Sequence, residues 1–402
     1  MSTAGVVAEY NPFHRGHAWH LERTRAALGP EGAVVCVMSG HWTQGGRCAL
    51  ADKWTRAALA LEGGADLVLE LPVAWATASA ERFARGAVEL LAATGVVDTL
   101  SFGSEAGDLA PLSRAAACLD SPDYARALSP LLRAGLSFPA ARQQAARALI
   151  GPAADCLGQP NNSLGVEYLR AVAALGATLG AMTVPRRGAG HHGGEEGGFA
   201  SATHIRALLA AGEREEAGRL LLPGALEALG EDLADMARCQ RAVLARLRCM
   251  TADDFAALPD AGAAEGLPRR LEAAARRAVS LEEFYALAKT RRYTHARLRR
   301  LAVRAFLGLE AADLPERPAC LRVLGVNERG RGLLARMRES SALPVITKPA
   351  HARALGGAVL AQLELEARAT DLFALCLPRV RPGGEEWLHG PVVVEKKAAP
   401  LF

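Results

Sequence analysis

Short apolar runs alternate with helix-like stretches over the first hundred residues, and this alternation restricts the possible folds more than any other feature. Four runs rich in Val or Leu end at turn residues: 4–9, 33–39, 65–71 and 98–103. The stretches between them have the pattern of helices: 18–28, 52–62 and 79–91. Runs this short suit strands buried on both faces. Strand–helix alternation therefore predicts an α/β fold with a Rossmann-like, doubly wound parallel sheet.

The pattern changes along the rest of the 402-residue chain. Residues 161–174 predict a helix capped by Asn161, and residues 181–185 predict a fifth strand. Beyond residue 212 helical patterns follow one another, ending in a smaller mixed piece. Since the length favours two domains, we expect a nucleotide-binding domain at 1–212 and a mainly α-helical domain at 213–402.

Composition and cysteine usage indicate an intracellular protein. The eight cysteines include no CxxC pair and fit neither a zinc site nor a secreted disulfide framework. The N-terminus lacks the basic start of a signal peptide, and no apolar window is long enough to span a membrane. We expect a cytoplasmic protein with no membrane association, and nothing in the sequence points to a protein partner.

The turn after the first predicted strand carries the strongest chemical signal, an HxGH string at His14–His17. Gly16 allows a phosphate to approach the backbone, and a helix N-terminus offers unpaired N–H groups to an anion. His14 and His17 can both donate hydrogen bonds to phosphate oxygens and stabilise charge on a five-coordinate phosphorus. In a parallel sheet this turn should meet the loops at 40–48 and 103–107. Two alternatives are a metal site formed with His20 and incidental polar residues at a helix start.

A second phosphate clamp is indicated near residue 201. Ser201 and Thr203 lie at the start of a predicted helix, and Arg206 follows one turn later. Hydroxyls at a helix N-terminus together with a guanidinium suit an anion. Taken alone the segment is also an ordinary N-cap with a surface Arg. Its combination with HxGH in one domain favours the clamp.

Basic residues gather between residues 269 and 304. Eleven Lys and Arg face three Glu there, with Tyr293 and His295 among them. Clustered Arg with an aromatic ring is typical of RNA backbone contact and base stacking. The alternative is a solvated helix face. The residues for which we predict RNA binding are Lys289, Arg291, Arg292, Tyr293, Arg297 and Arg300.

These motifs occur within a longer series of blocks that resembles the bacterial tRNA(Met) cytidine acetate ligase family, part of the HxGH nucleotidyltransferase superfamily. The blocks follow in order along most of the chain: GVVAEYNPFHRGHAWHL at 5–21, MSGHWTQGG at 38–46, DKWTRAALALEGGADLVLELP at 52–72, SAERFARGAVELL at 79–91, FGSEAGD at 102–108, PNNSLGVEYL at 160–169, SATHIR at 201–206, KTRRYTHARLRR at 289–300 and LRVLGV at 321–326. The resemblance implies that acetate attacks the α-phosphate of ATP to give acetyl-adenylate. The wobble cytidine of elongator tRNA(Met) then takes the acetyl group to give N4-acetylcytidine and AMP.

By matching positions, the resemblance implies an ATP site. Its residues would be Val7, Ala8, Glu9, Tyr10, Asn11, Pro12, Phe13, His14, Arg15, Gly16, His17, Ala18, Trp19, His20, Gly103, Asn161, Arg186 and Arg187, with Ser201, Thr203 and Arg206 on the pyrophosphate side. His14 and His17 would be catalytic. Lys53 is a candidate to meet the acyl-adenylate, and the alternative is a surface helix lysine. Magnesium is expected as Mg-ATP, without a dedicated carboxylate cluster.

One loop departs from the family pattern. Relatives usually carry QRGEPA where this chain has Gln44-Gly45-Gly46-Arg47-Cys48-Ala49, so that an Arg becomes Gly and an acid becomes Arg. The loop should face the active site, where acetate or cytidine is recognised. Two other functions remain open: a small-molecule adenylyltransferase acting on a phosphorylated metabolite, and an RNA-binding protein without catalysis.

Overall fold

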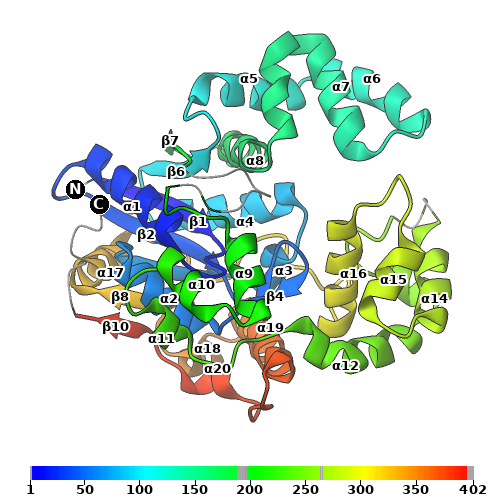
Figure 1. Cartoon of the computed structure of the whole chain (residues 1–402). Coiled ribbons are helices and arrows are strands. Elements are labelled where there is room, and N and C mark those ends of the chain that lie inside the picture. The colour runs from blue at the N-terminus through cyan, green and yellow to red at the C-terminus, as the bar shows by residue number, and fades with distance from the viewer. Residues whose placement is uncertain (1, 188–194, 196, 263, 265, 396–402) are drawn as a thin grey trace.

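A mostly parallel sheet forms the centre of the computed structural model, which describes residues 2–187, 195, 197–262, 264 and 266–395 (Figure 1). The strand order is β10-β8-β5-β2-β1-β6-β7, and β9 pairs with β8. The strand bounds are β1 Thr3–Ala8, β2 Ala33–Ser39, β5 Leu67–Leu71, β6 Thr99–Ser104, β7 Gly180–Pro185, β8 Leu321–Asn327, β9 Val345–Ile346 and β10 Val392–Val394. A separate hairpin pairs β3 (Trp42–Thr43) with β4 (Arg47–Cys48).

The first five strands of the sheet have the doubly wound topology that the sequence predicts. Strands β5, β2, β1, β6 and β7 are parallel neighbours in that order. The chain leaves β1 toward β2 on one side and returns to β6 on the other, so the switch point lies between β1 and β6. Ligands of such sheets bind beyond the carboxyl ends of the strands at this point. The HxGH turn follows β1, and Gly103 lies at the end of β6.

Both faces of the central strands are buried, because their side chains alternate between two cores. In β2, Val35 and Val37 belong to one hydrophobic cluster, whereas Cys36 and Met38 belong to another. The first cluster packs under α4 (Ala80–Ala93) and the second under α2 (Lys53–Glu62). The Val-rich composition of the strand follows from this two-sided burial.

Helices surround the sheet, and a group of them forms a separate lobe next to β6 and β7 (Figure 1). The remaining helices of the first part are α1 Arg15–Leu28, α3 Val73–Ala76, α5 Leu109–Leu119, α6 Pro122–Arg133, α7 Phe138–Ile150, the 3-10 helix η1 Gly151–Gly158, α8 Pro160–Leu175 and α9 Ala202–Ala211. Asp52 and Ser79 cap α2 and α4, each accepting a hydrogen bond from a backbone N–H of the first turn. The expected helices are therefore present, with α1 beginning three residues earlier than its apolar pattern suggests.

The C-terminal part completes the sheet. Strand β8 pairs antiparallel with β5, and β10 pairs parallel with β8. The later helices are α10 Arg214–Leu220, α11 Ala225–Leu229, α12 Met236–Arg248, α13 Ala252–Ala256, α14 Leu267–Arg277, α15 Leu281–Ala288, α16 His295–Leu307, α17 Glu328–Ser340, η3 Pro349–His351, α18 Ala352–Leu355, α19 Gly357–Phe373, η4 Ala374–Cys376 and α20 Glu385–Leu388. The division at residue 212 stays a prediction, and the sheet runs across it.

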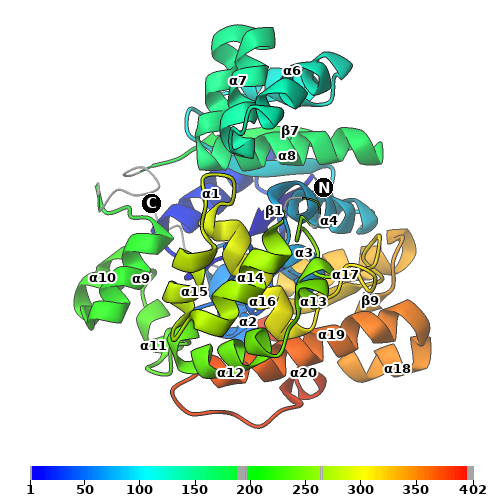
Figure 2. The same cartoon turned by 90° about the vertical axis from the view of Figure 1, so that its right-hand side faces the viewer.

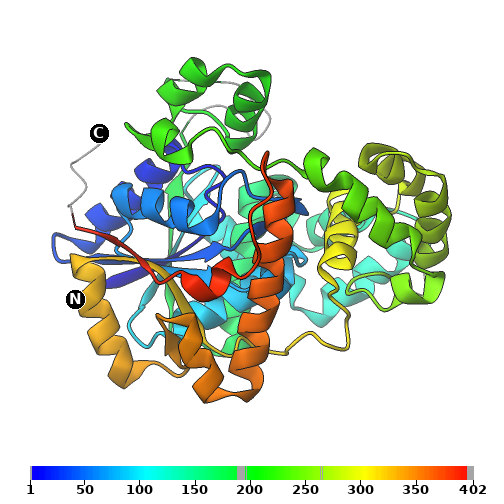
Figure 3. The same cartoon turned by 90° about the horizontal axis from the view of Figure 1, so that it is seen from below.

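Helices α12 to α16 form a helical cluster beside the sheet, with its own hydrophobic core (Figure 2). Helix α19 runs along the boundary between this helical cluster and the sheet (Figure 3). Trp42 of the hairpin is fully buried in the same core and donates a hydrogen bond from Nε1 to the Ala369 carbonyl at 2.9 Å. Among the described helices, none is both long and apolar enough to cross a membrane.

Candidate functional site

His14 and His17 cap the start of α1 reciprocally. The Nδ1 of His14 accepts from the Gly16 backbone N–H at 3.0 Å, and the Nδ1 of His17 accepts from the His14 backbone N–H at 3.3 Å. The two rings stack with centroids 3.7 Å apart. Because each Nδ1 accepts a hydrogen bond, each neutral ring carries its own hydrogen on Nε2. The cap therefore turns two side-by-side imidazoles into Nε2–H donors.

The electrostatic surroundings keep both imidazoles neutral. Burial, together with the nearby charges of Arg186 and Arg206, lowers the pKa of His14 to about 3. Burial also lowers the pKa of His17 well below its ordinary value, together with His14 and Arg186. Neutral rings donate without carrying a charge of their own, while the neighbouring guanidiniums supply the positive charge that a polyphosphate needs.

The turn rests on apolar side chains that fix its shape. Tyr10 and Phe13 are buried in the core beneath α2, with ring centroids 4.7 Å apart, and Ala18 lies in the same core. Tyr10 has a positive φ of 46° at the sharp turn after β1. These residues were predicted to cradle ATP. The structure gives Tyr10, Phe13 and Ala18 a supporting place below the turn.

Arg206 of α9 is joined directly to the HxGH turn. Its Nη1 donates to the Asn11 carbonyl at 2.6 Å, and its Nη2 donates to Thr203 Oγ1 at 3.0 Å. Ser201 is the N-cap of α9 and accepts from the His204 backbone N–H. The structure therefore places the second predicted phosphate clamp next to the first, with the N-terminus of α9 beside the HxGH turn.

The end of β6 contributes a polar network on the opposite side. Arg186 donates from Nη1 to Asn161 Oδ1 at 2.8 Å, and Asn161 donates from Nδ2 to Glu105 at 2.8 Å. A Cβ at Gly103 would lie 3.6 Å from Arg186 Cγ, an ordinary van der Waals distance, so Gly103 lies directly beside Arg186. The predicted residues Gly103, Asn161 and Arg186 thus form one group.

The predicted capping role of Asn161 is wrong. Helix α8 begins at Pro160 after an N-cap Gln159 that makes no side-chain capping bond. Glu105 supplies the acceptor instead, since its carboxylate takes hydrogen bonds from the backbone N–H groups of Asn161 and Asn162. Sequence reasoning missed Glu105, although an acid in the loop that follows a predicted strand was a signal for it.

Trp19 and His20 lie on the α1 side of the site. The guanidinium of Arg187 stacks over the Trp19 ring at 3.7 Å and that of Arg23 at 4.2 Å. His20 is hydrogen-bonded to Ser101 Oγ at 3.0 Å. His20 is therefore engaged with β6, which does not fit the alternative of a three-histidine metal site.

Arg56 is a second residue that the sequence analysis missed. Its guanidinium is fully buried and donates to four backbone carbonyls, those of Glu9, Ser39, Gly40 and Ala51. It therefore ties the ends of β1 and β2 to the start of α2 and holds the loops of the site in place. A charged residue on the apolar face of a predicted helix was the available signal.

Lys53 is part of a buried ion-pair cluster. Its Nζ lies 2.6 Å from Glu70 Oε1 and 2.6 Å from Glu386 Oε2, and its side chain is fully buried. Burial lowers the pKa of Lys53, but Glu386 and Glu70 outweigh it and the net pKa is raised. Lys53 is therefore not the surface lysine of the alternative. Its enclosed ammonium favours a structural role, and the expected catalytic role stays a prediction.

The predicted RNA-binding residues differ in their exposure to solvent. Arg291 and Arg292 are exposed in the turn between α15 and α16, and Lys289 ends α15. Tyr293 is only 5% exposed within the core of the helical cluster, so its ring is not available to stack on a base. Arg297 donates to the Asp260 carbonyl at 3.0 Å, and Arg300 donates to the Gln44 carbonyl at 3.5 Å.

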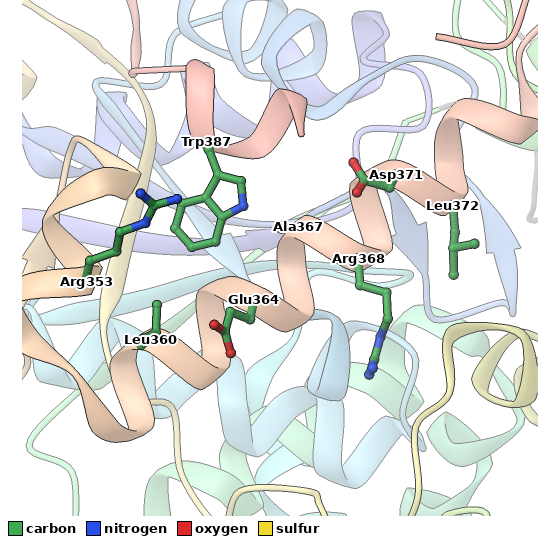
Figure 4. Close-up of a pocket in the computed structure, with 8 residues that line it drawn as sticks. All are labelled: Arg353, Leu360, Glu364, Ala367, Arg368, Asp371, Leu372 and Trp387. Atoms are coloured by element: carbon green, nitrogen blue, oxygen red, sulfur yellow. The ribbon is translucent and has the colours of Figure 1, made fainter. Parts of the chain in front are cut away.

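A surface pocket of about 750 Å³ lies away from these residues, along α19 (Figure 4). It is lined by Arg353, Leu360, Glu364, Ala367, Arg368, Asp371, Leu372 and Trp387. No predicted site residue belongs to it. Within the described ranges, no three or more His, Cys, Asp or Glu side chains form an arrangement suited to a metal ion.

Comparison with known proteins gives consistent matches along the chain. A family model described as HIGH Nucleotidyl Transferase matches residues 1–386. The tRNA(Met) cytidine acetate ligase of Syntrophotalea carbinolica is 40% identical, covering 94% of this chain and 95% of the relative. The same-named protein of Acetivibrio thermocellus is 33% identical, covering 98% of this chain and 100% of the relative.

Two solved structures share the fold. Thermotoga maritima TmcAL bound with alpha-thio ATP superimposes with a TM-score of 0.89 at 32% identity, covering 98% of this chain and 100% of the other. The apo form gives a TM-score of 0.92 at 33% identity with the same coverage. These likenesses extend over both the sheet and the helical cluster.

Proposed function

The chain belongs to the tRNA(Met) cytidine acetate ligase family within the HIGH nucleotidyl transferases, and on that premise we propose that it is an ATP-dependent acetate ligase. Its substrates are ATP, acetate and elongator tRNA(Met), and its product is N4-acetylcytidine at the wobble position. The observation that carries the proposal is the pair of neutral, Nε2-protonated imidazoles of His14 and His17 at the switch point of the sheet.

In the first step an acetate oxygen attacks the α-phosphate of ATP. The new P–O bond gives acetyl-adenylate, and the bond to the β-phosphate breaks to release pyrophosphate. The Nε2–H groups of His14 and His17 donate to phosphate oxygens, where negative charge increases in the transition state. Arg206 and the N-terminus of α9 hold the leaving pyrophosphate, and Arg186 adds charge from the β6 side. Magnesium carried by ATP would screen the charges of its phosphates.

In the second step the N4 amino group of the wobble cytidine attacks the acetyl carbonyl carbon. The C–N bond forms, a proton leaves the nitrogen, and AMP departs with the bonding electrons. The exposed residues Arg291 and Arg292 support RNA binding by the helical cluster. We propose that residues 1–212 carry the ATP site while later residues bind the tRNA, and that the reaction takes place in the cytoplasm.

Pyrophosphate release from ATP, measured with and without acetate, tests the first step. Acetate-dependent release followed by transfer of labelled acetyl to elongator tRNA(Met) would support the whole proposal. Release that needs a phosphorylated metabolite in place of acetate would favour a small-molecule adenylyltransferase. Binding of tRNA without any turnover would leave only an RNA-binding protein.

A further inference from the structure

The β3–β4 hairpin connects the HxGH turn to the helical cluster. On one side the Gln44 backbone N–H donates to Glu9 Oε1 at 2.6 Å, next to the turn. On the other side Gly46, with φ of 71°, packs so closely on α16 that an added Cβ would lie 2.4 Å from the Arg300 backbone nitrogen. The hairpin is therefore a rigid bridge with fixed contacts at both ends.

Arg47 is the first residue of β4 and the exposed charge on this bridge. Its backbone carbonyl accepts from Thr43 Oγ1 at 3.1 Å, which fixes the strand pairing. Between residues 2 and 395, as far as they are described, no carboxylate lies within ion-pair distance of the Arg47 guanidinium. The backbone of Arg47 is thus fixed by the strand pairing, and its guanidinium makes no ion pair with a described carboxylate, although Glu282 is near enough to raise its pKa.

Positive charge continues on both sides of Arg47. Burial and then Arg299 of α16 lower the pKa of Arg47, and Glu282 opposes them in part. Arg47 in turn lowers the pKa of Arg206, which burial also lowers and Glu9 raises. Because like charges are placed together only at a cost, three guanidiniums in a row suit a ligand with several negative charges.

We propose that Arg47 contacts a backbone phosphate of the substrate RNA next to the reacting nucleotide, so that the strand passes from α16 across the hairpin to the ATP site. The contact is a guanidinium–phosphate hydrogen bond of the kind that positions nucleic acid without reading its sequence. This inference rests on the proposed acetylation of tRNA and names the residue that aligns the RNA.

Two assays on Arg47→Ala and Arg47→Lys test the contact. The first is acetate-dependent exchange of pyrophosphate with ATP, which requires no RNA. The second is acetyl transfer to elongator tRNA(Met) over a range of salt concentrations. We expect Arg47→Ala to raise KM for tRNA about tenfold, the loss of one charge-assisted hydrogen bond. The slope of log KM against log salt should also fall by roughly 0.7–0.9, as for one lost phosphate contact. Arg47→Lys should recover most of both effects.

Arg331→Ala provides the matched control, since Arg331 is an exposed arginine of α17, which lies across the sheet from the helical cluster (Figure 1). Its KM and salt slope should equal those of the wild type. An unchanged KM for tRNA in Arg47→Ala would overturn the inference while leaving the ligase function intact. A raised KM for ATP or acetate in the exchange assay would also overturn it, because Arg47 would then serve the small substrates. Failure of the wild type to acetylate tRNA would instead refute the proposed function.

Discussion

Replacing Lys53 by methionine should destabilise the protein without removing a group from the reaction. Lys53 Nζ pairs with Glu70 and Glu386 at 2.6 Å each, and all three side chains are no more than 1% exposed. Removing one partner of a buried ion pair leaves an unpaired charge and costs about 3–5 kcal/mol. Glu386 keeps Arg322 as a second partner at 3.4 Å, whereas Glu70 loses its direct ion pair. The double variant Lys53→Met/Glu70→Gln should therefore recover a large part of the loss.

Urea unfolding of the wild type and both variants measures this effect, with acetate-dependent pyrophosphate exchange measured on the folded proteins. We expect a lower unfolding midpoint for Lys53→Met, partial recovery in the double variant, and exchange rates within about threefold of the wild type. The reasoning would be refuted by a variant that unfolds like the wild type but no longer exchanges pyrophosphate. That result would return Lys53 to the active site.

Three further predictions concern the histidine pair, the helical cluster and the buried carboxylates. His17→Ala should slow adenylate formation by ~10²-fold or more, as loss of a preorganised donor does; pyrophosphate exchange on a variant shown to be folded checks this, and unchanged kinetics would contradict the phosphate role. Arg292→Glu should weaken tRNA binding in a filter assay and leave exchange nearly intact; an equal loss of both would contradict the separation of ATP and RNA binding. Burial and Glu70 raise the pKa of Glu366 well above its ordinary value, so the folded protein keeps a proton that the unfolded chain releases as pH rises. The free energy of unfolding of the wild type should therefore fall more between pH 5 and pH 8 than that of Glu366→Gln, as measured by urea unfolding at both pH values. Equal falls in the wild type and the variant would show that the Glu366 carboxyl is already ionised and would contradict the prediction.

Much of the fold could be predicted because each N-terminal strand and helix is determined by residues within or next to it. The Val-rich run of β2 matches its predicted bounds at Ala33–Ser39, and the caps Asp52 and Ser79 mark where α2 and α4 begin. The pairing of β8 with β5 was not predictable in this way. It joins residues about 250 positions apart, and short apolar runs carry no information on which edge they join.

The candidate site was predicted where function depends on a contiguous motif. His14, His17 and Arg206 lie as the HxGH and SxTxxR strings suggest, because each string contains its own turn and helix start. The environment of Lys53 depends on Glu386, which is more than three hundred residues later in the sequence. Tyr293 is a similar case, since burial in the core of the helical cluster is a property of packing that a basic run does not reveal.

The position of β8 also affects how the chain is made. The apolar edge of β5, LVLEL, emerges from the ribosome roughly 250 residues before its antiparallel partner. At about 5–20 residues per second, that edge stays without its neighbour for about 12–50 s. Exposed apolar edges pair readily with strands of other chains. The nascent protein therefore has a defined interval in which association between chains competes with folding, and the interval closes only after the helical cluster has been synthesised.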